Sequence, residues 1–454
     1  MTSFDFIAQK DAQEAQMAFI RRVIDAKNDI VTFVDNCLAW NQAGRFLDYF
    51  KGSFNLSIAV ENVETSERVL IRFPFPGKIY GPWRDKKVKD EVMVIDYLYE
   101  HTSIPVPRVY HWGLTEESPQ QLGPFIIEGF MEGENLGDIL KTPTENEADP
   151  AILNPNIDEA TLSIVYEQIA GFILEISCLT FPHIGTISKD TISGEWTVTG
   201  PPLTYDMNEV VTFAGFPADH FTTMVPFSRA SDYFTARAQC LQTNLDTQRN
   251  IAFEAKDTIW NRYVARHCFA KLIPSHGIID DSGPFRLFCD DLRPSNMLVD
   301  PKTMRITAVL DFEFTNVMPA QFAYDLPWWL ILGQPGILVS EGKQKFLEVF
   351  EPRKEQFIRA MEKVEAKSPL PARELRLSAR MRDSWVSERF WFNLASRSSF
   401  DVDEIYWETL HKDGLGEAML DTTILARKDK FLERKKAQFD AYLAEKQHDP
   451  RFDH

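Results

Sequence analysis

Alternating apolar and polar positions mark the first part of the chain as strand-forming. Residues 56–60 and 68–73 alternate apolar and polar side chains on either side of a turn, which predicts the start of a small antiparallel sheet. The apolar run that begins at Pro124 predicts a buried strand, and it passes into a glycine-punctuated connector that ends near Leu136. These segments predict a small sheet in the N-terminal part of the chain.

A helical repeat follows the second of these strands. Val88, Val92, Ile95 and Leu98 recur three or four positions apart within residues 86–100, which predicts an amphipathic helix. Two prolines follow shortly afterwards, and the residue before a proline disfavours helical geometry. The helix is therefore expected to end before them.

The remainder of the chain is mainly helical in its pattern. The strongest helical periodicity covers residues 158–176, and further helices are predicted over 249–272, 377–395 and 400–407. Residues 428–449 are polar and predict either a helix or a frayed tail. The sequence thus predicts a large helical part after the small sheet.

Three short apolar runs interrupt the helical part. Residues 286–289 and 297–299 lie on either side of a polar loop, and residues 306–310 end at Asp311. Short apolar runs bounded by turn residues predict buried strands. We expect the first two to form a strand–loop–strand hairpin that holds the polar loop, and the third to deliver Asp311.

The polar loop carries a candidate catalytic arrangement. Asp291 is followed five positions later by Asn296, and Asp311 lies in the next turn. In phosphoryl transfer the protein contributes mostly positioning and electrostatics, together with one carboxylate that orients and deprotonates the acceptor hydroxyl. Oxygen atoms of Asp and Asn are suitable ligands for Mg²⁺. The spacing favours Asp291 as the base, rather than its neighbour Asp290, and Asn296 and Asp311 as metal ligands.

The same segment also fits an ordinary turn between two strands. Asp, Pro, Ser and Asn are common turn residues, and short motifs have a real rate of chance matches. The loop therefore needs support from the rest of the chain.

The segment from Cys289 to Glu313 resembles the aminoglycoside phosphotransferase and choline kinase family. The family sequence there is His-x-Asp-x-x-x-x-Asn followed by an Asp-Trp/Phe-Glu turn, which corresponds here to Asp311-Phe-Glu. Cys289 stands where the family usually has a histidine that braces the loop, and a buried cysteine can pack there as a small apolar group. The C-terminal helices resemble a fungal-type branch. The resemblance implies an α+β, protein-kinase-like two-lobed fold with a small mixed β-sheet N-lobe and a large, mainly helical C-lobe.

The resemblance also implies ATP and Mg²⁺ as cofactors. Arg72 stands at the strand position that usually carries a lysine for the α- and β-phosphates, and Glu91 at the helix position that pairs with that cation. The alternatives are an arginine that extends to solvent and a solvated carboxylate near a helix N-terminus. The resemblance implies a phosphate-covering loop made of Gly52, Ser53, Phe54 and Asn55. It also implies a hinge whose backbone would meet the adenine, made of Glu128, Gly129, Phe130 and Met131.

The expected domains follow from this assignment. Residues 1–130 would form an N-terminal extension and the nucleotide-covering N-lobe, and residues 131–454 the helical C-lobe with the catalytic loop and C-terminal helices. Residues 187–246 are predicted to be an insertion, either a packing element or a wall for the acceptor. A basic cluster between the first sheet and its helix is expected to be an ordinary solvated face, with direct contact to ATP as the alternative. It comprises Lys78, Arg84, Lys86, Lys87 and Lys89.

The acceptor is predicted to be a hydroxyl of a small molecule. Only residues 312–324 separate Asp311 from Asp325, which leaves no room for the activation segment of a protein kinase. Aminoglycosides, choline-like amines and metabolite hydroxyls all remain open, because the fold does not select among them. The competing hypothesis is a non-catalytic nucleotide-binding or partner-binding module, motivated by Arg72 and Cys289.

Composition narrows the remaining possibilities. A chain of 454 residues with 44% hydrophobic residues can bury a large core in two or three substructures. A net charge of -18 argues against a nucleic-acid partner. The lack of a signal peptide and of a run of about 18 apolar residues predicts a cytoplasmic protein without a membrane span. Five cysteines without paired spacing predict free thiols, and the oligomeric state stays open.

Overall fold

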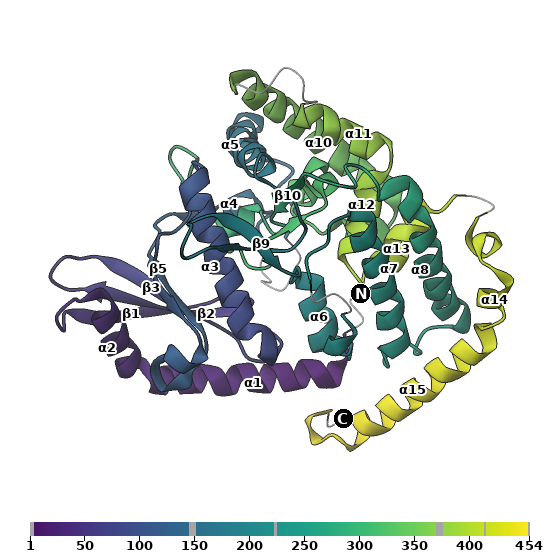
Figure 1. The fold of residues 1–454 in the computed structure, drawn as a ribbon, viewed down its shortest axis with the longest axis horizontal. Coiled ribbons are helices and arrows are strands. Elements are labelled where there is room, and N and C mark those ends of the chain that lie inside the picture. The colour runs from purple at the N-terminus through teal and green to yellow at the C-terminus, as the bar shows by residue number, and fades with distance from the viewer. Residues whose placement is uncertain (1–3, 145–150, 222–224, 369–375, 413–414, 453–454) are drawn as a thin grey trace.

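A small β-sheet lobe and a larger helical lobe make up the molecule (Figure 1). The computed structural model describes residues 4–144, 151–221, 225–368, 376–412 and 415–452. The predicted α+β, two-lobed, kinase-like fold is confirmed. All five cysteines are free thiols, as predicted.

The N-lobe contains a five-stranded antiparallel sheet. In spatial order its strands are β1 (Gly44–Lys51), β2 (Asn55–Asn62), β3 (Arg68–Pro74), β5 (Phe125–Gly129) and β4 (Val109–Gly113). Strands β2 and β3 match the alternating segments of the sequence, and β5 matches the apolar run that begins at Pro124. Strand β1 was not predicted, because most of its side chains are partly or fully exposed and the apolar pattern is weak.

Three helices cover this sheet. Helices α1 (Phe6–Asp25) and α2 (Lys27–Leu38) lie on one side, and α3 (Arg84–His101) lies between the sheet and the helical lobe (Figure 1). The buried aromatic ring of Phe19 in α1 packs edge-on against Phe73 of β3. The helix predicted over residues 86–100 is therefore present as α3, whereas α1 and α2 were not predicted.

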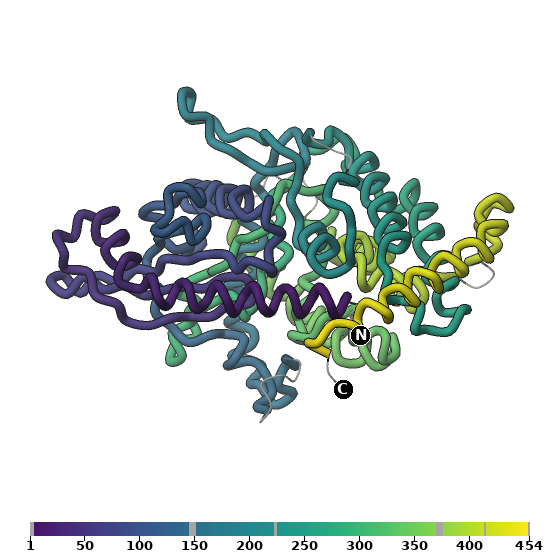
Figure 2. The backbone as a smooth tube through the Cα atoms, turned by 90° about the horizontal axis from the view of Figure 1, so that it is seen from below, coloured from purple at the N-terminus to yellow at the C-terminus, as the bar shows by residue number. Residues whose placement is uncertain are grey.

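Helix α1 also reaches the helical lobe. Asp5 caps its first turn, accepting from the backbone N–H of Ile7 at 2.9 Å, and forms a 2.6 Å ion pair with Arg249. The N–H of Phe6 donates to the hydroxyl of Tyr442 in α15 (Lys428–His448) at 3.2 Å. Figure 2 follows this course, with the start of α1 beside the C-terminal helix. One helix thus contacts both lobes.

The helical lobe begins after β6 (Glu134–Asn135). Its helices besides α15 are α4 (Leu136–Leu140), α5 (Glu159–Ser177), α6 (Tyr205–Phe213), α7 (Ala230–Thr247), α8 (Lys256–His276), α9 (Pro335–Ser340), α10 (Lys343–Lys367), α11 (Leu377–Val386), α12 (Arg389–Arg397), α13 (Val402–Ile405) and α14 (Thr422–Leu425). Its short strands are β7 (Thr180–Phe181), β8 (Thr186–Lys189), β9 (Trp196–Gly200), β10 (Phe285–Phe288), β11 (Met297–Asp300), β12 (Arg305–Val309) and β13 (Asn316–Met318).

Helix α5 is the central helix of this lobe. Among the described helices it is the one that is long and apolar enough to span a membrane by length and composition. Its side chains Leu162, Val165 and Ile169 are fully buried in the main core, and the helix packs along α10 (Figure 1). Core packing therefore accounts for its apolar composition.

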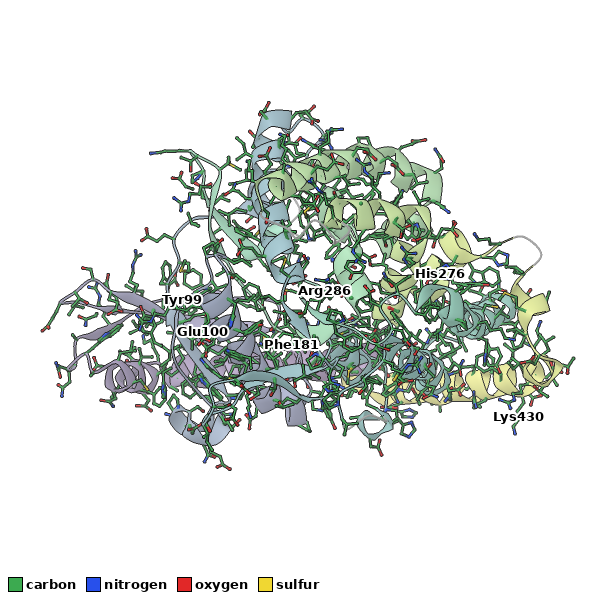
Figure 3. The ribbon with its side chains drawn as sticks, turned by 45° about the horizontal axis from the view of Figure 1, so that its top comes forward. Tyr99, Glu100, Phe181, His276, Arg286 and Lys430 are labelled. Carbon is green, nitrogen blue, oxygen red and sulfur yellow. The ribbon has the colours of Figure 1, made fainter. Side chains whose placement is uncertain are left out.

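The predicted insertion 187–246 contains regular structure. Strands β8 and β9 form a hairpin, and the indole N–H of Trp196, the first residue of β9, donates to Glu100 at 2.9 Å. Glu100 lies at the end of α3 and is labelled in Figure 3. Helix α7 contributes Phe234 and Leu241 to the main core. These contacts attach the segment to both lobes.

Two sequence predictions about the helical lobe are wrong in detail. The helix predicted over 377–395 is interrupted at Glu388, whose φ of +63° breaks helical geometry between α11 and α12. The strands on either side of the polar loop do not form a hairpin. Strand β10 pairs with β13 and β7, whereas β11 pairs with β12 and β6, so the loop connects two separate sheets.

Candidate active site

The loop after β10 brings two of the predicted residues into contact. The side-chain amide of Asn296 donates to the backbone oxygen of Asp291 at 2.9 Å and to its carboxylate at 2.8 Å. Arg293 forms an ion pair with the other carboxylate oxygen at 2.8 Å. These contacts close the loop on itself and fix the direction of the Asp291 carboxylate, whose side chain is still 40% exposed.

Asp311 emerges beside this loop because β11 and β12 are paired. The backbone N–H of Leu310 donates to the oxygen of Asn296 at 2.8 Å, so the two residues lie at adjacent ends of the pair. Asp311 adopts a φ of +65°, a region that Asp tolerates better than most residues. Its buried Oδ1 atom has no hydrogen-bond partner within the described structure. The structure thus brings Asp291, Asn296 and Asp311 together.

The pair predicted between β3 and α3 is present. Arg72 lies 2.5 Å from Glu91, and its Nε lies 2.9 Å from the carboxylate of Glu128 in β5. Burial alone would lower the pKa of Arg72, but Glu128 and Glu91 raise it above its ordinary value. Burial alone would raise the pKa of Glu91, but Arg72 and Lys87 lower it to about 2. The alternatives of a solvent-facing arginine and a solvated glutamate are excluded by this burial.

Lys87 also belongs to the site, although its basic sequence neighbourhood predicted a solvated face. It is only 2% exposed, and its ammonium lies 2.9 Å from Glu91 and 2.5 Å from Glu313. Burial opposes its charge, yet Glu313 and Glu91 raise its pKa to about 12. Lys87 and Glu313 were both missed. One signal was available, because Lys87 lies one helical turn before Glu91 on the same face of α3.

The predicted phosphate-covering loop is the turn between β1 and β2. Gly52 and Ser53 are exposed at its tip, where the N–H of Gly52 donates to the oxygen of Asn55 at 2.9 Å. The buried Asn55 side chain accepts from Lys87 and donates to Glu313, both at 3.2 Å. The loop therefore connects directly to the cluster around Asp311.

Phe54 directs this loop towards the helical lobe. Its ring packs edge-on against Tyr205 of α6 at 5.6 Å and against Phe314 at 6.3 Å between centroids. Tyr205 comes from the predicted insertion, and the turn after Asp311 supplies Phe314. An aromatic cluster from three segments thus closes one side of the site.

The predicted hinge continues from β5. Glu128 is buried and directed at Arg72, while the N–H groups of Gly129 and Phe130 donate to backbone oxygens of Arg108 and Arg68 at 3.0 and 3.1 Å. These two amides are engaged within the N-lobe. The adenine contact of the backbone from Glu128 to Met131 stays a prediction.

Burial and like charges perturb the two acidic candidates. Partial burial, with contributions from Asp290 and Glu313, raises the pKa of Asp291 to about 6, against the lowering effect of Arg293 and Asn296. Burial and the nearby carboxylates of Glu313 and Glu91 raise the pKa of Asp311 well above its usual range. A cluster of perturbed acidic groups is typical of functional sites.

This cluster has the donor atoms and the charge that a divalent cation needs. Arg72 and Lys87 share it with four carboxylates, from Glu91, Glu128, Asp311 and Glu313. Four carboxyl groups thus face two cations, and one oxygen of Asp311 is unpartnered. No three His, Cys, Asp or Glu side chains converge on a metal position within the described ranges. Mg²⁺ is usually held by one or two carboxylates together with phosphate oxygens and water, and Asn296 and Asp311 would be its protein ligands here.

Cys289 lies directly before the loop, where a histidine was expected. Burial raises the pKa of its thiol to about 12, so the thiol is protonated at neutral pH. The residue lines a cavity of about 60 Å³ behind the loop, together with Asp325 and Trp328. The thiol interacts with the Thr315 side chain and with the backbone of Asp291, but it is a small group with a weak donor where the family has an imidazole ring.

These two lobes and the loop define a kinase-like protein. Residues 212–366, which include the loop and the turn at Asp311, match the model of the phosphotransferase enzyme family. The family resemblance inferred from the sequence is therefore confirmed, and it supports a phosphotransferase. Arg72 and Glu91 lie outside the matched residues.

Comparison with solved structures gives distant matches. The aminoglycoside phosphotransferase APH(4)-Ia is 14% identical with a TM-score of 0.42, covering 89% of this chain and 98% of that chain. Ethanolamine kinase from Plasmodium vivax is 12% identical with a TM-score of 0.40, and the match covers 90% of this chain and 84% of that chain. Choline kinase from Cryptosporidium parvum is 13% identical with a TM-score of 0.40, covering 89% of both. All three TM-scores lie below 0.5 and all three identities below 25%. No curated protein sequence matches the chain significantly.

Proposed function

We propose that the protein is an ATP- and Mg²⁺-dependent phosphotransferase that acts on a hydroxyl of a small molecule. The observation that carries this proposal is the contact between Asp291 and Asn296 beside Asp311, whose buried Oδ1 has no partner. A base, an amide ligand and a carboxylate ligand are the side chains that phosphoryl transfer to an alcohol requires.

Each residue has a definite task in this proposal. Asp291 accepts the hydroxyl proton of the acceptor, and with a pKa of about 6 it is ionised at neutral pH. Asn296 and Asp311 hold Mg²⁺, which neutralises phosphate charge when it is bound. Arg72, oriented by Glu91 and Glu128, contacts the phosphates. Its planar guanidinium would bind phosphate oxygens in pairs, unlike a lysine.

The acceptor is proposed to be small and the protein cytoplasmic. The regular structure between Asp311 and Asp325 is β13 and one short 3-10 helix (Ala320–Tyr324), and these few residues leave no room for an activation segment that binds a peptide. A net charge of -18 disfavours a nucleic-acid substrate. The small acceptor is supported by this short segment, and the cytoplasmic location by the five free cysteines, which are typical of a reducing compartment.

The test is acceptor-dependent release of ADP from Mg-ATP. A panel of aminoglycosides, choline-like amines and metabolite alcohols is offered to the wild type, to Asp291→Asn and to the control Asp300→Asn at the far end of β11. We expect the Asp291→Asn rate to fall about 10²- to 10⁴-fold and the control to match wild type. Equal rates in all three proteins would refute the role of Asp291.

Calorimetry distinguishes the enzyme from a non-catalytic module. The substitutions at Arg72 and Cys289 relative to the family motivate that alternative. Binding of ATP that requires Mg²⁺, together with turnover, supports the enzyme. If ATP binds but is not turned over with any acceptor or with water, the non-catalytic module is supported instead.

A further inference from the structure

Arg397 contacts the catalytic loop from outside the matched family segment. It is the last residue of α12, and its guanidinium forms an ion pair with Asp290, the neighbour of Asp291. Its side chain is 8% exposed. Helix α12 lies beyond residue 366, where the family match ends.

The position of this guanidinium is fixed by several neighbours. It lies over the rings of Phe288 and Phe322, at 5.1 and 5.4 Å from their centroids, and 3.9 Å from the carboxylate of Asp325. Phe288 is the last residue of β10, directly before Cys289. Arg397 therefore joins the strand that enters the loop to the first acidic residue of the loop.

Asp290 is held from a second direction. The indole N–H of Trp328 donates to the backbone oxygen of Asp290 at 3.0 Å. Its side chain and its backbone are thus anchored by different segments, one of them supplied by α12. Between Asp290 and Phe288 lies Cys289, which borders the cavity behind the loop.

We propose that Arg397 is a positioning residue that sets the geometry of Asp291 through its ion pair with Asp290. The proposal rests on the proposed function, because it assigns Asp291 as the base. A cavity and a small thiol leave the loop without a bulky brace at position 289, and the paired guanidinium supplies one from α12. A displacement of about 1 Å in a reacting group can cost about 100-fold in rate.

Arginine is the residue suited to this task. Its planar fork can pair with Asp290 and face Asp325 while its flat side stacks on aromatic rings. A lysine has the charge but neither the fork nor the stacking surface. Arg397→Lys should therefore keep part of the effect, and Arg397→Gln should lose it.

The experiment compares Arg397→Gln, Arg397→Lys and Asp290→Asn with wild type. Rates are measured with Mg-ATP and the acceptor that the panel identifies, or with water if none is found. We expect kcat to fall about 10- to 100-fold in Arg397→Gln and in Asp290→Asn, less in Arg397→Lys, with KM for ATP within about twofold of wild type. The double variant Arg397→Gln/Asp290→Asn should lose no more kcat than the more affected single variant, because both substitutions break the same ion pair.

Hydrogen exchange provides a readout that does not depend on turnover. Peptides covering residues 289–297 should exchange faster in Arg397→Gln, and peptides in the N-lobe should not. The matched control is Arg389→Gln, which removes an ion pair to Asp383 from the same helix without contact to the loop. It should leave kcat and loop exchange unchanged.

The outcomes separate this inference from the proposed function. If wild type has no turnover while Arg397→Gln loosens the loop, the function fails and the positioning stands. If wild type is active and Arg397→Gln keeps its kcat and loop exchange, the positioning fails. Asp290 is 43% exposed, so Asp290→Asn carries the test if the arginine variants do not fold.

Discussion

The ammonium of Lys87 lies 2.5 Å from the carboxylate of Glu313, which joins helix α3 of the N-lobe to the turn that carries Asp311. The same carboxylate oxygen accepts a hydrogen bond from Asn55 at 3.2 Å, so the phosphate-covering loop also contacts this ion pair. Both members of the ion pair are buried. One contact therefore connects three segments that the proposed reaction must align.

Lys87→Met should strongly destabilise the protein. The substitution retains most of the volume but leaves Glu313 without its buried counter-charge and leaves Glu91 with Arg72 alone. Breaking a buried ion pair by removing one partner costs about 3–5 kcal/mol. Urea unfolding followed by circular dichroism should show this loss as a lower midpoint at an unchanged slope.

The neighbouring lysine is the matched control. Lys86 pairs with Asp90 at 2.6 Å, and its side chain is 36% exposed. Lys86→Met should cost less than about 1 kcal/mol, because partly exposed ion pairs contribute little. Equal losses for both variants would contradict the buried role of Lys87.

Asp311→Asn should stabilise the ligand-free protein at pH 8 and abolish its response to Mg-ATP. The buried carboxylate has an unpartnered oxygen and acidic neighbours, so a neutral amide removes an unfavourable charge at a φ that Asn tolerates. We expect the free energy of unfolding of the ligand-free variant to exceed that of wild type by about 1 kcal/mol or more. In wild type, Mg-ATP at a hundred times its Kd should add about 2.7 kcal/mol, and in the variant almost nothing.

Thermal unfolding with and without Mg-ATP measures both effects. A Mg-ATP shift in Asp311→Asn as large as that in wild type would show that Asp311 is not a metal ligand. A variant that is less stable than wild type without ligand would contradict the inference that its carboxylate is strained by its neighbours.

Most of the fold could be predicted because its signals are local. Helices α3 and α5 and strands β2 and β3 have strong periodic patterns, and the structure contains them near the predicted bounds. Strand β1 lacks a pattern because it lies at the edge of the sheet. The pairing of β10 and β11 was wrong because partners distant in sequence, such as β13 and β6, decide it.

The site could be predicted where spacing alone fixes geometry. Asp291, Asn296 and Asp311 lie within one loop and the next turn, so counting residues was sufficient to group them. Arg397 could not be assigned in this way, and for Lys87 the spacing gave one signal alone, its place one helical turn before Glu91. A lysine in a polar run gives the same local signal whether it faces solvent or a buried carboxylate on another segment, and Arg397 meets the loop only through tertiary packing.

Phe54→Ala should loosen the phosphate-covering loop. The ring joins this loop to Tyr205 and Phe314 of the helical lobe, and its loss removes both contacts. We expect a loss of about 1–2 kcal/mol in unfolding free energy and faster amide exchange at residues 52–55. The control is Phe50→Ala in β1, whose side chain is 45% exposed. Equal effects on loop exchange would argue against the aromatic anchor.

Asp325→Asn should remove a pH dependence of stability. Burial raises the pKa of Asp325 to about 7, although Arg397 and the hydrogen bonds from Ser384 and Asn393 oppose the rise. An unfolded aspartate ionises near pH 3.8, so between these values the folded protein binds a proton that the unfolded chain does not. The stability contributed by this group is present at low pH and is lost as pH rises towards 7.

Unfolding free energies of both proteins between pH 5 and pH 8 provide the measurement. The difference, Asp325→Asn minus wild type, should become more positive by up to about 1.4 kcal/mol per pH unit until pH 7, and then level off. Subtraction of the two curves cancels the other titrating groups, including Asp291 and Asp311. A difference that is constant across this range would mean that the Asp325 carboxylate is already ionised in the folded protein at pH 5, with Arg397 as an effective counter-charge.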